Sequence, residues 1–598
     1  MISKNIKENP AIFLFRKMWK YSGDNKKNVV VFVILSILSN FVNLALPLVV
    51  AHILNKVQTS GVNADNFKGL LLWFTAFIVI EAFSWLFHGP SRIMERKNAF
   101  VVRANFKKFL FDGVLDLPQN WHTERHSGDT IDKISRGTSA LHDFSENVFI
   151  VISAVITFVG SFIALAFFNL HSIYIALFMT IIALTIVSKF DAVLVPQYKK
   201  LNRAQNKVSE KIFDTISNIS TIIILRVEPF ISRMVYQRIM SPYKLYNENV
   251  KINEYKWFLV SIVGGFMTFF VLSSYVISSV NAGAVILVGT LYALYSYAER
   301  VTRVMFDFTY LYSKIVRQRA SVANAEELSE EFVEKVQKPS VNLLEGWKTL
   351  EIKNLSFSYD SGEGVNLHLE NLNLKIMNGQ NIALIGESGS GKSTFLRVFR
   401  ELYSPSSLEL FIDNHHLKGG FSAISSGVSL IPQDPEIFST TIKENITLGI
   451  TRSQEEIEHY VDMALFGDVV RKLPKKYQSS IVERGVNLSG GEKQRLALAR
   501  GLLASSDKTF VLLDEPTSSV DSKNERAIYE NIFREFNEKT IISSIHRLHL
   551  LTLFDNIFFF DNGEIIDSGT FDELYENSPR FRKLWEKYTK SQNKEQIE

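Results

Sequence analysis

The sequence contains no cysteine among its 598 residues. This absence excludes disulfide scaffolds, thiolate metal sites and cysteine-protease chemistry. The net charge is also small, +4 at neutral pH, so bulk charge gives no support to a nucleic-acid partner and we expect none. Hydrophobic residues make up 46% of the chain, which is high for a soluble enzyme and low for a protein lying wholly in a membrane. The chain is too long for one core, so we expect several domains of unlike character.

No small-residue cleavage site follows the apolar run near the basic N-terminus, so we expect no cleaved signal peptide. The segment 1–27 mixes basic residues with bulky apolar ones, Ile12, Phe13, Phe15, Met18 and Trp19. This pattern favours an amphipathic helix lying in a membrane interface, and an ordinary amphipathic helix of a soluble domain is the alternative.

Six apolar runs of nearly bilayer length occupy the first three hundred residues. They cover about 28–54, 67–87, 147–168, 172–190, 257–280 and 282–298. One such run could be a buried soluble helix, but six predict an all-α transmembrane domain, which we place at residues 28–318. Its long connections have helical periodicity, so we expect the spans to continue as cytoplasmic extensions.

Lysine and arginine crowd the connection between the second and third runs and that between the fourth and fifth. The other connections are short and nearly uncharged. The positive-inside rule therefore places both long connections and both termini in the cytoplasm.

A change of pattern follows this half of the chain. Residues 319–348 turn polar and contain Pro339 and Gly346, which predicts a linker. From residue 349 to 588, short β-rich runs alternate with amphipathic helices, typical of an α/β domain with a largely parallel sheet. We expect a polar tail at 589–598.

A glycine-rich loop, “IGESGSGKST”, stands between an apolar strand and a helix. Its glycines let backbone N–H groups turn toward phosphate oxygens, and the helix N-terminus adds its positive dipole end. The lysine would contribute a positive charge to the β- and γ-phosphates, and the serine after it a hydroxyl for Mg²⁺. The loop predicts ATP contacts from Gly386, Glu387, Ser388, Gly389, Ser390, Gly391, Lys392, Ser393 and Thr394.

A second apolar strand, in “KTFVLLDEPTSSVD”, ends in two carboxylates. Asp514 at the strand tip fits a Mg²⁺ partner, and Glu515, pointing the other way, fits a general base for the attacking water. Two solvated acids at a strand end are the alternative. By themselves His546, Gln433 and Tyr359 are weak candidates, because each residue type is common in surfaces, loops or strand packing.

The ordered set of Tyr359, “GESGSGKST”, Gln433, “LSGGE”, “LLDEP”, “SSVD” and His546 resembles the nucleotide-binding domain of ABC transporters. The resemblance covers residue 349 to about residue 588. With six spans ahead of it, the chain looks like a half-transporter of the ABC exporter class. “LALPLVVAHILNKV” and “LDLPQNWHTERHSGDTIDKIS” are similar to the first span and the first cytoplasmic contact segment of that class.

The resemblance implies a role for each weak candidate. Tyr359 would stack on adenine, and Gln433 would sense Mg²⁺ and the attacking water. His546 would contact the γ-phosphate. The implied catalytic residues are thus Glu515, His546 and Gln433, and the implied Mg²⁺ residues are Ser393, Gln433 and Asp514. Asp521 would run across a dimer interface, and Glu483 would lie in a loop that reports to the cytoplasmic helices.

In this family, “LSGGE” closes on the ATP held by the opposite subunit. The residues concerned are Leu488, Ser489, Gly490, Gly491 and Glu492, the last where the family more often has glutamine. One such domain per chain implies a dimer with two composite ATP sites. Heterodimeric members commonly lack the catalytic glutamate in one chain, so the presence of Glu515 favours a homodimer and leaves a heterodimer open.

The resemblance also implies ATP hydrolysis coupled to transport, with ATP and Mg²⁺ as ligands. Aromatic, apolar spans would suit export or flipping of amphipathic, lipid-like or peptide substrates. An importer on the same scaffold, an ATP-gated channel and a regulatory subunit are the alternatives. We expect a multi-pass protein of the bacterial inner membrane.

Overall fold

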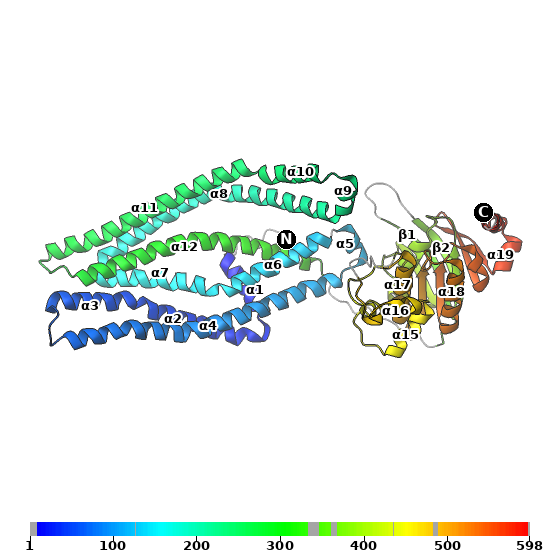
Figure 1. Cartoon of the computed structure of the whole chain (residues 1–598), viewed down its shortest axis with the longest axis horizontal. Helices are drawn as coiled ribbons and strands as arrows, with labels where there is room; N and C mark the ends of the chain where they lie inside the picture. Colours follow the sequence, from blue (N-terminus) through cyan, green and yellow to red (C-terminus); the bar gives the residue numbers. More distant parts are fainter. Residues whose placement is uncertain are drawn as a thin grey trace. The chain divides into compact units, whose positions relative to one another are not determined.

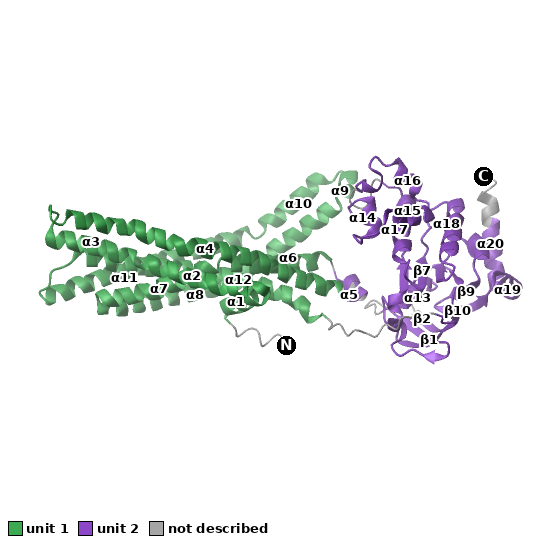
Figure 2. Ribbon diagram, turned by 90° about the horizontal axis from the view of Figure 1, so that it is seen from below, with its two compact units in different colours: residues 1–116, 126–332 green, residues 117–125, 333–598 purple. Residues whose placement is uncertain are grey.

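The computed structural model describes residues 9–125, 127–332, 346–359, 368–434, 436–481 and 488–595. The chain divides into two compact units (Figure 2). Unit 1 comprises Met1–Asp116 and His126–Phe332, and unit 2 comprises Leu117–Arg125 and Val333–Glu598.

Unit 1 is built of α-helices, several of them far longer than a bilayer is thick (Figure 1). They are α1 (Pro10–Tyr21), α2 (Lys26–Leu44), α3 (Leu46–Ser60), α4 (Phe67–Leu115), α6 (Ser127–Glu146), α7 (Val148–Phe168), α8 (Leu170–Ser217), α9 (Ile219–Leu225), α10 (Glu228–Met240), α11 (Tyr243–Asn281) and α12 (Val288–Glu327). Figure 1 shows α8 and α11 side by side, with the short α9 and α10 at one end of the pair. Helices of 48 and 49 residues, α8 and α4, fit spans that extend beyond the bilayer.

Within the described residues, five helical segments are long and apolar enough to cross a membrane. They are Gly23–Ser60, Phe67–Leu115, Val148–Phe168, Leu170–Ser217 and Glu228–Asn281. Only 11% to 28% of the most apolar stretch of each is buried, so most of these side chains require lipid around them. The five segments contain the first five predicted spans.

The sixth predicted span, 282–298, differs from the other five. It begins in a turn at Gly283, whose φ of +63° ends α11, and α12 starts only at Val288. Charged residues, Glu299 and Arg300, follow soon after, so the apolar stretch of α12 is short. This span stays a prediction.

The first predicted span is broken into α2 and α3 around Ala45, two residues before Pro47. A helix break leaves backbone carbonyls without helical partners. Side chains of α12 satisfy them: the Tyr297 hydroxyl donates to the Leu44 carbonyl at 2.7 Å, and the Arg300 guanidinium donates to the Asn43 carbonyl at 3.2 and 3.3 Å.

Helix α1 is amphipathic, as its sequence predicts. It buries Phe13, Leu14 and Met18 against other helices of unit 1, and its Lys17 pairs with Glu326 of α12 at 2.6 Å. Three further apolar side chains stay exposed, Ile12, Phe15 and Trp19. One face of α1 therefore packs against unit 1. That the exposed face lies in a membrane interface stays a prediction.

Helix α12 continues through residues 319–327, which the sequence analysis assigns to the linker. Val322, Ala325 and Leu328 keep a buried stripe at helical spacing, and this packing extends the helix. At the other end of the chain, α20 (Pro579–Glu595) likewise continues into the expected polar tail.

Unit 2 contains two sheets. The smaller one is antiparallel, in the order β2 (His368–Met377), β1 (Thr349–Ser358), β4 (Ser407–Ile412) and β5 (His415–His416). The larger has the order β10 (Glu564–Gly569), β9 (Asn556–Asp561), β3 (Asn381–Ile385), β8 (Thr540–Ser544), β7 (Phe510–Asp514) and β6 (Val428–Ile431). All its pairings are parallel except that of β10 with β9, so the expected largely parallel sheet is present.

Two cores enclose the larger sheet. The helices of unit 2 are α5 (Gln119–Glu124), α13 (Lys392–Phe399), α14 (Ile442–Thr447), α15 (Gln454–Met463), α16 (Gly467–Lys472), α17 (Gly490–Ala504), α18 (Ser522–Glu535), α19 (Phe571–Asn577) and α20. Because strand side chains alternate, Phe510 and Leu512 of β7 pack with α13 and β1, whereas Val511 and Leu513 pack with α17 and α18. Parallel β3, β7 and β8 therefore end at one edge between the two cores, and this edge carries the candidate site.

Candidate nucleotide-binding site

The loop between β3 and α13 has the backbone geometry that a phosphate cradle requires. Gly386, Gly389 and Gly391 have φ of +147°, +85° and +106°, which glycine adopts at little cost. A Cβ at Gly386 would lie 2.3 Å from the Phe560 carbonyl oxygen, so no larger residue fits there, whereas a Cβ at Gly389 would meet open space. The loop thus turns its backbone inward ahead of the α13 N-terminus.

Two side chains of this loop fit an anion. The Lys392 ammonium donates to the carbonyls of Gly386 and Glu387, at 2.9 and 3.0 Å, which holds the charge inside the loop. Burial lowers the pKa of Lys392, against the charges of Glu515 and Asp514. The hydroxyl of Ser390 is buried and has no hydrogen-bond partner within the described residues. Such an orphaned donor fits a phosphate oxygen.

Asp514 ends β7 and is buried, with 2% of its surface exposed. One of its oxygens accepts hydrogen bonds from the hydroxyls of Ser393 and Ser544, each at 2.8 Å. Oxygen donors of this kind are what Mg²⁺ prefers in phosphate-loop proteins. Ser393 and Asp514, predicted from the sequence as Mg²⁺ residues, therefore lie together.

Glu515 occupies an unusual backbone position, with φ of +46°. A residue other than glycine in this region costs of order 1–3 kcal/mol and is characteristic of functional sites. Its carboxylate accepts a hydrogen bond from the Gln433 side-chain amide at 3.0 Å. Burial raises the pKa of the Glu515 carboxyl, opposed by the charges of His546 and Lys392. A carboxylate with a raised pKa beside a phosphate loop suits a general base.

Several of these groups line one cavity of about 560 Å³, although Gly386, Glu387 and Asp514 are not part of its lining. Its lining includes the loop residues 388–394 and the predicted Tyr359, Gln433, Glu515 and His546. Tyr359 packs edge-on against Phe357 and Tyr403, with ring centroids 4.8 and 5.1 Å apart, which fixes its ring at the cavity wall. The cavity also includes Arg397 of α13, which the sequence analysis did not single out.

The second glycine-rich motif begins α17. Ser489 caps this helix: its hydroxyl accepts from the Glu492 backbone N–H at 3.3 Å, and its own N–H donates to the Glu492 carboxylate at 2.7 Å. That backbone hydrogen bond lowers the pKa of Glu492. Leu488 is buried, and Gly490 and Gly491 form the first turn. Among the residues that line the cavity in the described part of unit 2, none belongs to 488–492.

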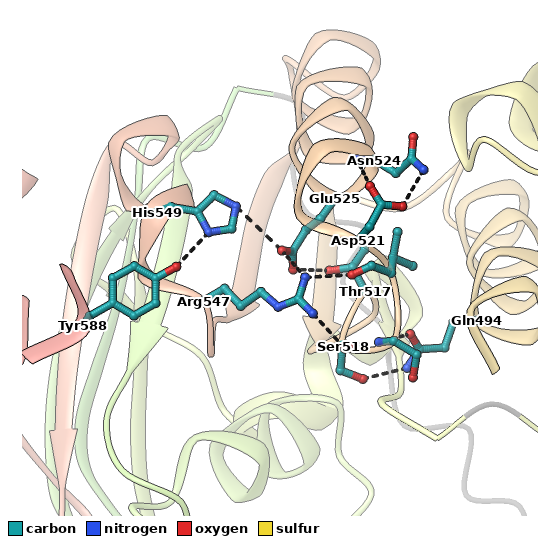
Figure 3. A network of polar contacts seen from close by, with 11 residues as sticks. Gln494, Thr517, Ser518, Asp521, Asn524, Glu525, Arg547, His549 and Tyr588 are labelled. Atoms are coloured by element: carbon teal, nitrogen blue, oxygen red, sulfur yellow. Dashed lines mark hydrogen bonds and ion pairs between the residues drawn. The ribbon is translucent and has the colours of Figure 1, made fainter. Parts of the chain in front are cut away.

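Asp521 caps α18 instead of entering the cavity. Its carboxylate accepts from the Asn524 backbone N–H at 3.0 Å and from the Asn524 amide at 2.6 Å. Glu483 lies outside the described residues. A network that the sequence analysis missed surrounds the segment before Asp521, through Gln494, Glu525 and Arg547 (Figure 3). Gln494 and Arg547 lie within three residues of predicted motifs, but their partners are distant in sequence.

Two family models match the chain. Residues 29–305 match the ABC transporter transmembrane region, and residues 369–518 match the ABC transporter model. Mouse ATP-binding cassette sub-family B member 6 is 27% identical over 80% of this chain and 56% of its own length. Heavy metal tolerance protein from Schizosaccharomyces pombe is 29% identical over 79% of this chain and 57% of its own. The chain thus spans little more than half the length of these relatives.

A solved structure of a bacterial Atm1-family ABC exporter with ATP bound superposes with a TM-score of 0.81. The match covers 94% of this chain and 99% of that chain, at 21% identity. At this identity the match speaks for the fold alone. The expected fold class, a helical transmembrane part followed by an α/β domain, is confirmed.

Proposed function

The chain belongs to the ABC transporters, and we propose that it is a half-transporter of the exporter class, in which ATP hydrolysis drives a substrate across a membrane. The observation that carries this proposal is the geometry around Glu515. A candidate base, its amide partner Gln433 and a phosphate loop line one cavity, and all come from strand ends at one sheet edge.

The loop residues would bind ATP through backbone N–H groups, Lys392 and Ser390, and Tyr359 would stack on the base. Bound Mg²⁺ would neutralise phosphate charge, held by Ser393 and Asp514, whose side chains already meet at 2.8 Å. The donor set is oxygen-only, which agrees with that ion.

Glu515 would take the proton of the attacking water. Burial raises the pKa of the Glu515 carboxyl toward neutral pH, which favours acceptance of a proton. The hydrogen bond from the Gln433 amide fixes the orientation of the carboxylate. His546 would contact the γ-phosphate from the end of β8, on the same cavity wall. ATP binding, orientation of the Glu515 carboxylate and proton transfer would thus be carried out by residues at the ends of different strands.

The working unit would be a dimer. Ser489, Gly490 and Gly491 do not line the cavity of their own subunit within the described residues, which supports a role for their helix N-terminus at an ATP held by a second subunit. A second copy of this chain supplies that ATP, and the presence of Glu515 favours a homodimer over a pairing with a different half-transporter. Asp521 would lie along the interface.

The substrate would be amphipathic or lipid-like. Unit 1 contains a cavity of about 240 Å³ between α7, α8 and α12, lined by Thr180 and by apolar side chains that include Phe158, Leu184 and Met305. A hydrocarbon segment fits such a lining. Within the described residues, no feature favours an importer, a channel or a regulatory subunit.

The chain is an integral multi-pass membrane protein. We place it in a bacterial cell membrane, with both termini and the nucleotide-binding domain in the cytoplasm. The lysine and arginine content of the long connections supports the orientation. The lysine- and isoleucine-rich composition supports the bacterial setting.

ATP turnover by the purified chain in lipid nanodiscs, beside Glu515→Gln, tests the proposal. Turnover that is lost in the variant supports a homodimer with two active sites, and vesicle uptake or extrusion of amphipathic probes then gives the direction. Absence of turnover in both proteins contradicts the homodimer.

A further inference from the structure

The segment 517–521 runs between the candidate base Glu515 and helix α18, and every residue of it is held by a side chain from elsewhere or by its own helix cap (Figure 3). Thr517 donates its hydroxyl to Glu525 at 2.8 Å. Asp521 accepts from Asn524 at the start of α18. The three residues between them are held by two side chains from other elements, Gln494 and Arg547.

Arg547 follows His546 directly in the chain. Its guanidinium donates to the Val520 carbonyl at 2.7 Å and to the Ser518 carbonyl at 3.4 Å. The same group pairs with the Glu525 carboxylate at 3.2 Å. One planar cation therefore joins the turn that carries His546 to the segment that follows Glu515.

Glu525 is the anchor of this pair. Only 6% of its side chain is exposed, and its two oxygens are divided between Thr517 and Arg547. The His549 ring lies near this carboxylate. Its Nε2 is 3.8 Å from the Glu525 oxygen that pairs with Arg547, and its Nδ1 is 3.1 Å from the hydroxyl of Tyr588 in α20. A buried charge with this many partners specifies one geometry, since any displacement leaves it unpaired.

Gln494 holds the other side of the segment. From the first turns of α17 its amide donates to the Ser518 hydroxyl and accepts from the Ser519 N–H, both at 2.7 Å. The segment also passes close to Gly491: a Cβ there would lie 2.8 Å from the Ser519 carbonyl oxygen. The segment is thus in contact with the helix that begins at the “LSGGE” motif.

Polar bonds set this arrangement together with the packing of the buried Val520 side chain. A cavity of about 250 Å³ lies beside it, lined by Glu515, His546, Thr517, Glu525 and Arg547 among others. Where a cavity replaces packed side chains, the position of a loop depends on its hydrogen bonds.

We infer that Arg547 is a positioning residue for ATP hydrolysis: held by Glu525, it fixes the segment 518–520 relative to His546. The inference rests on the proposed function. Gln494 completes the arrangement by fixing the same segment to the helix of the “LSGGE” motif. The candidate catalytic residues His546 and Glu515 and the predicted interface residue Asp521 would then move together when ATP binds.

The test compares three variants of the full chain in nanodiscs: Arg547→Met, Glu525→Gln and the double variant. The Arg547→Met change removes the cation that pairs with the buried Glu525 carboxylate and leaves it with the Thr517 hydrogen bond, so both stability and turnover should fall. The double variant removes both charges, so its thermal stability should recover. Its turnover should stay lower than that of the wild type by between about tenfold and about a hundredfold, because the carbonyls of Ser518 and Val520 are still unheld.

ATP affinity separates positioning from general damage. We expect the dissociation constant for ATP to stay within about twofold of the wild type in the double variant, so that the loss lies in kcat. Glu530→Gln is the matched control, because it removes an exposed ion pair with Arg526 one turn along the same helix. It should change neither turnover nor ATP affinity.

A double variant whose stability and turnover both return to the wild-type values overturns the inference, because the pair would then be structural only. Turnover lost together with ATP binding also overturns it. Failure of the proposed function has a different signature: the wild type itself would show no turnover sensitive to Glu515→Gln, and the positioning role would fall with it.

Discussion

The side-chain amide of Gln433 donates a hydrogen bond of 3.0 Å to the carboxylate of Glu515. This bond joins the loop after β6 to the end of β7, and it orients the candidate base. Gln433→Ala should lower kcat by about tenfold while ATP affinity changes little, because a bond to the base acts on the chemical step. Steady-state turnover and ATP titration measure the two effects, and a rise in KM alone would contradict the assignment.

Gly386→Ala should abolish nucleotide binding. The added Cβ would lie 2.3 Å from the Phe560 carbonyl oxygen, and the φ of +147° is unsuited to alanine. The loop would have to shift, which removes the phosphate cradle. Fluorescent-nucleotide binding is the measurement. Gly379→Ala is the matched control: it imposes a similar backbone strain at φ +76°, but its Cβ meets only an ordinary contact at 3.6 Å, so binding should persist.

Glu492→Gln should lower the ATP concentration for half-maximal turnover by about two- to fivefold. Glutamine can keep both hydrogen bonds with Ser489, so the helix cap remains. The change removes a negative charge from the helix N-terminus that would approach the partner's γ-phosphate. The thermal midpoint should fall slightly, because the lowered pKa of Glu492 means that its charge stabilises the start of the helix. An unchanged ATP dependence would show that this charge has no influence on closure.

Asp413→Asn should lower the stability of the nucleotide-binding domain to unfolding at neutral pH but not at acid pH. The Asp413 carboxylate accepts from the backbone N–H groups of Lys348 and Thr349, at 2.9 and 2.8 Å, and these bonds lower its pKa. When the pKa of a carboxyl is lower in the folded protein than in the unfolded chain, its charged form stabilises the fold at pH values above the pKa of the unfolded chain. This contribution is lost as the pH falls through the folded pKa.

Thermal unfolding of both proteins across the acid range checks this prediction. The midpoints should converge as the pH falls. Glu409→Gln, an exposed change on the neighbouring strand β4, should have no pH-dependent effect. A constant difference between wild type and Asp413→Asn at all pH values would contradict a role for the charge.

Most of the nucleotide site could be predicted because its residues stand in short contiguous motifs at strand ends. Ser393 and Asp514, which the motifs assign to Mg²⁺, lie 2.8 Å apart, since parallel strands bring their C-terminal ends to one edge. The family order of motifs then supplied Tyr359, Gln433 and His546, whose residue types are uninformative alone. The catalytic and binding roles of all these residues stay predictions.

The network around Arg547 could not be predicted from the sequence. Its partners Ser518 and Val520 lie 29 and 27 positions away, and no periodic pattern marks a hydrogen bond to a backbone carbonyl. The continuation of α12 into the expected linker could not be predicted for a similar reason. Its buried apolar residues can be recognised as a packing surface only when the helices that cover them are known.

The break between α2 and α3 has a consequence for motion in the membrane. The carbonyls of Asn43 and Leu44, which the break leaves without helical partners, depend on Arg300 and Tyr297 of α12 for their hydrogen bonds. Sliding of the α2–α3 break along α12 would separate both carbonyls from their donors. We therefore expect the break and α12, although more than 250 residues apart in the chain, to move together when the transporter changes conformation.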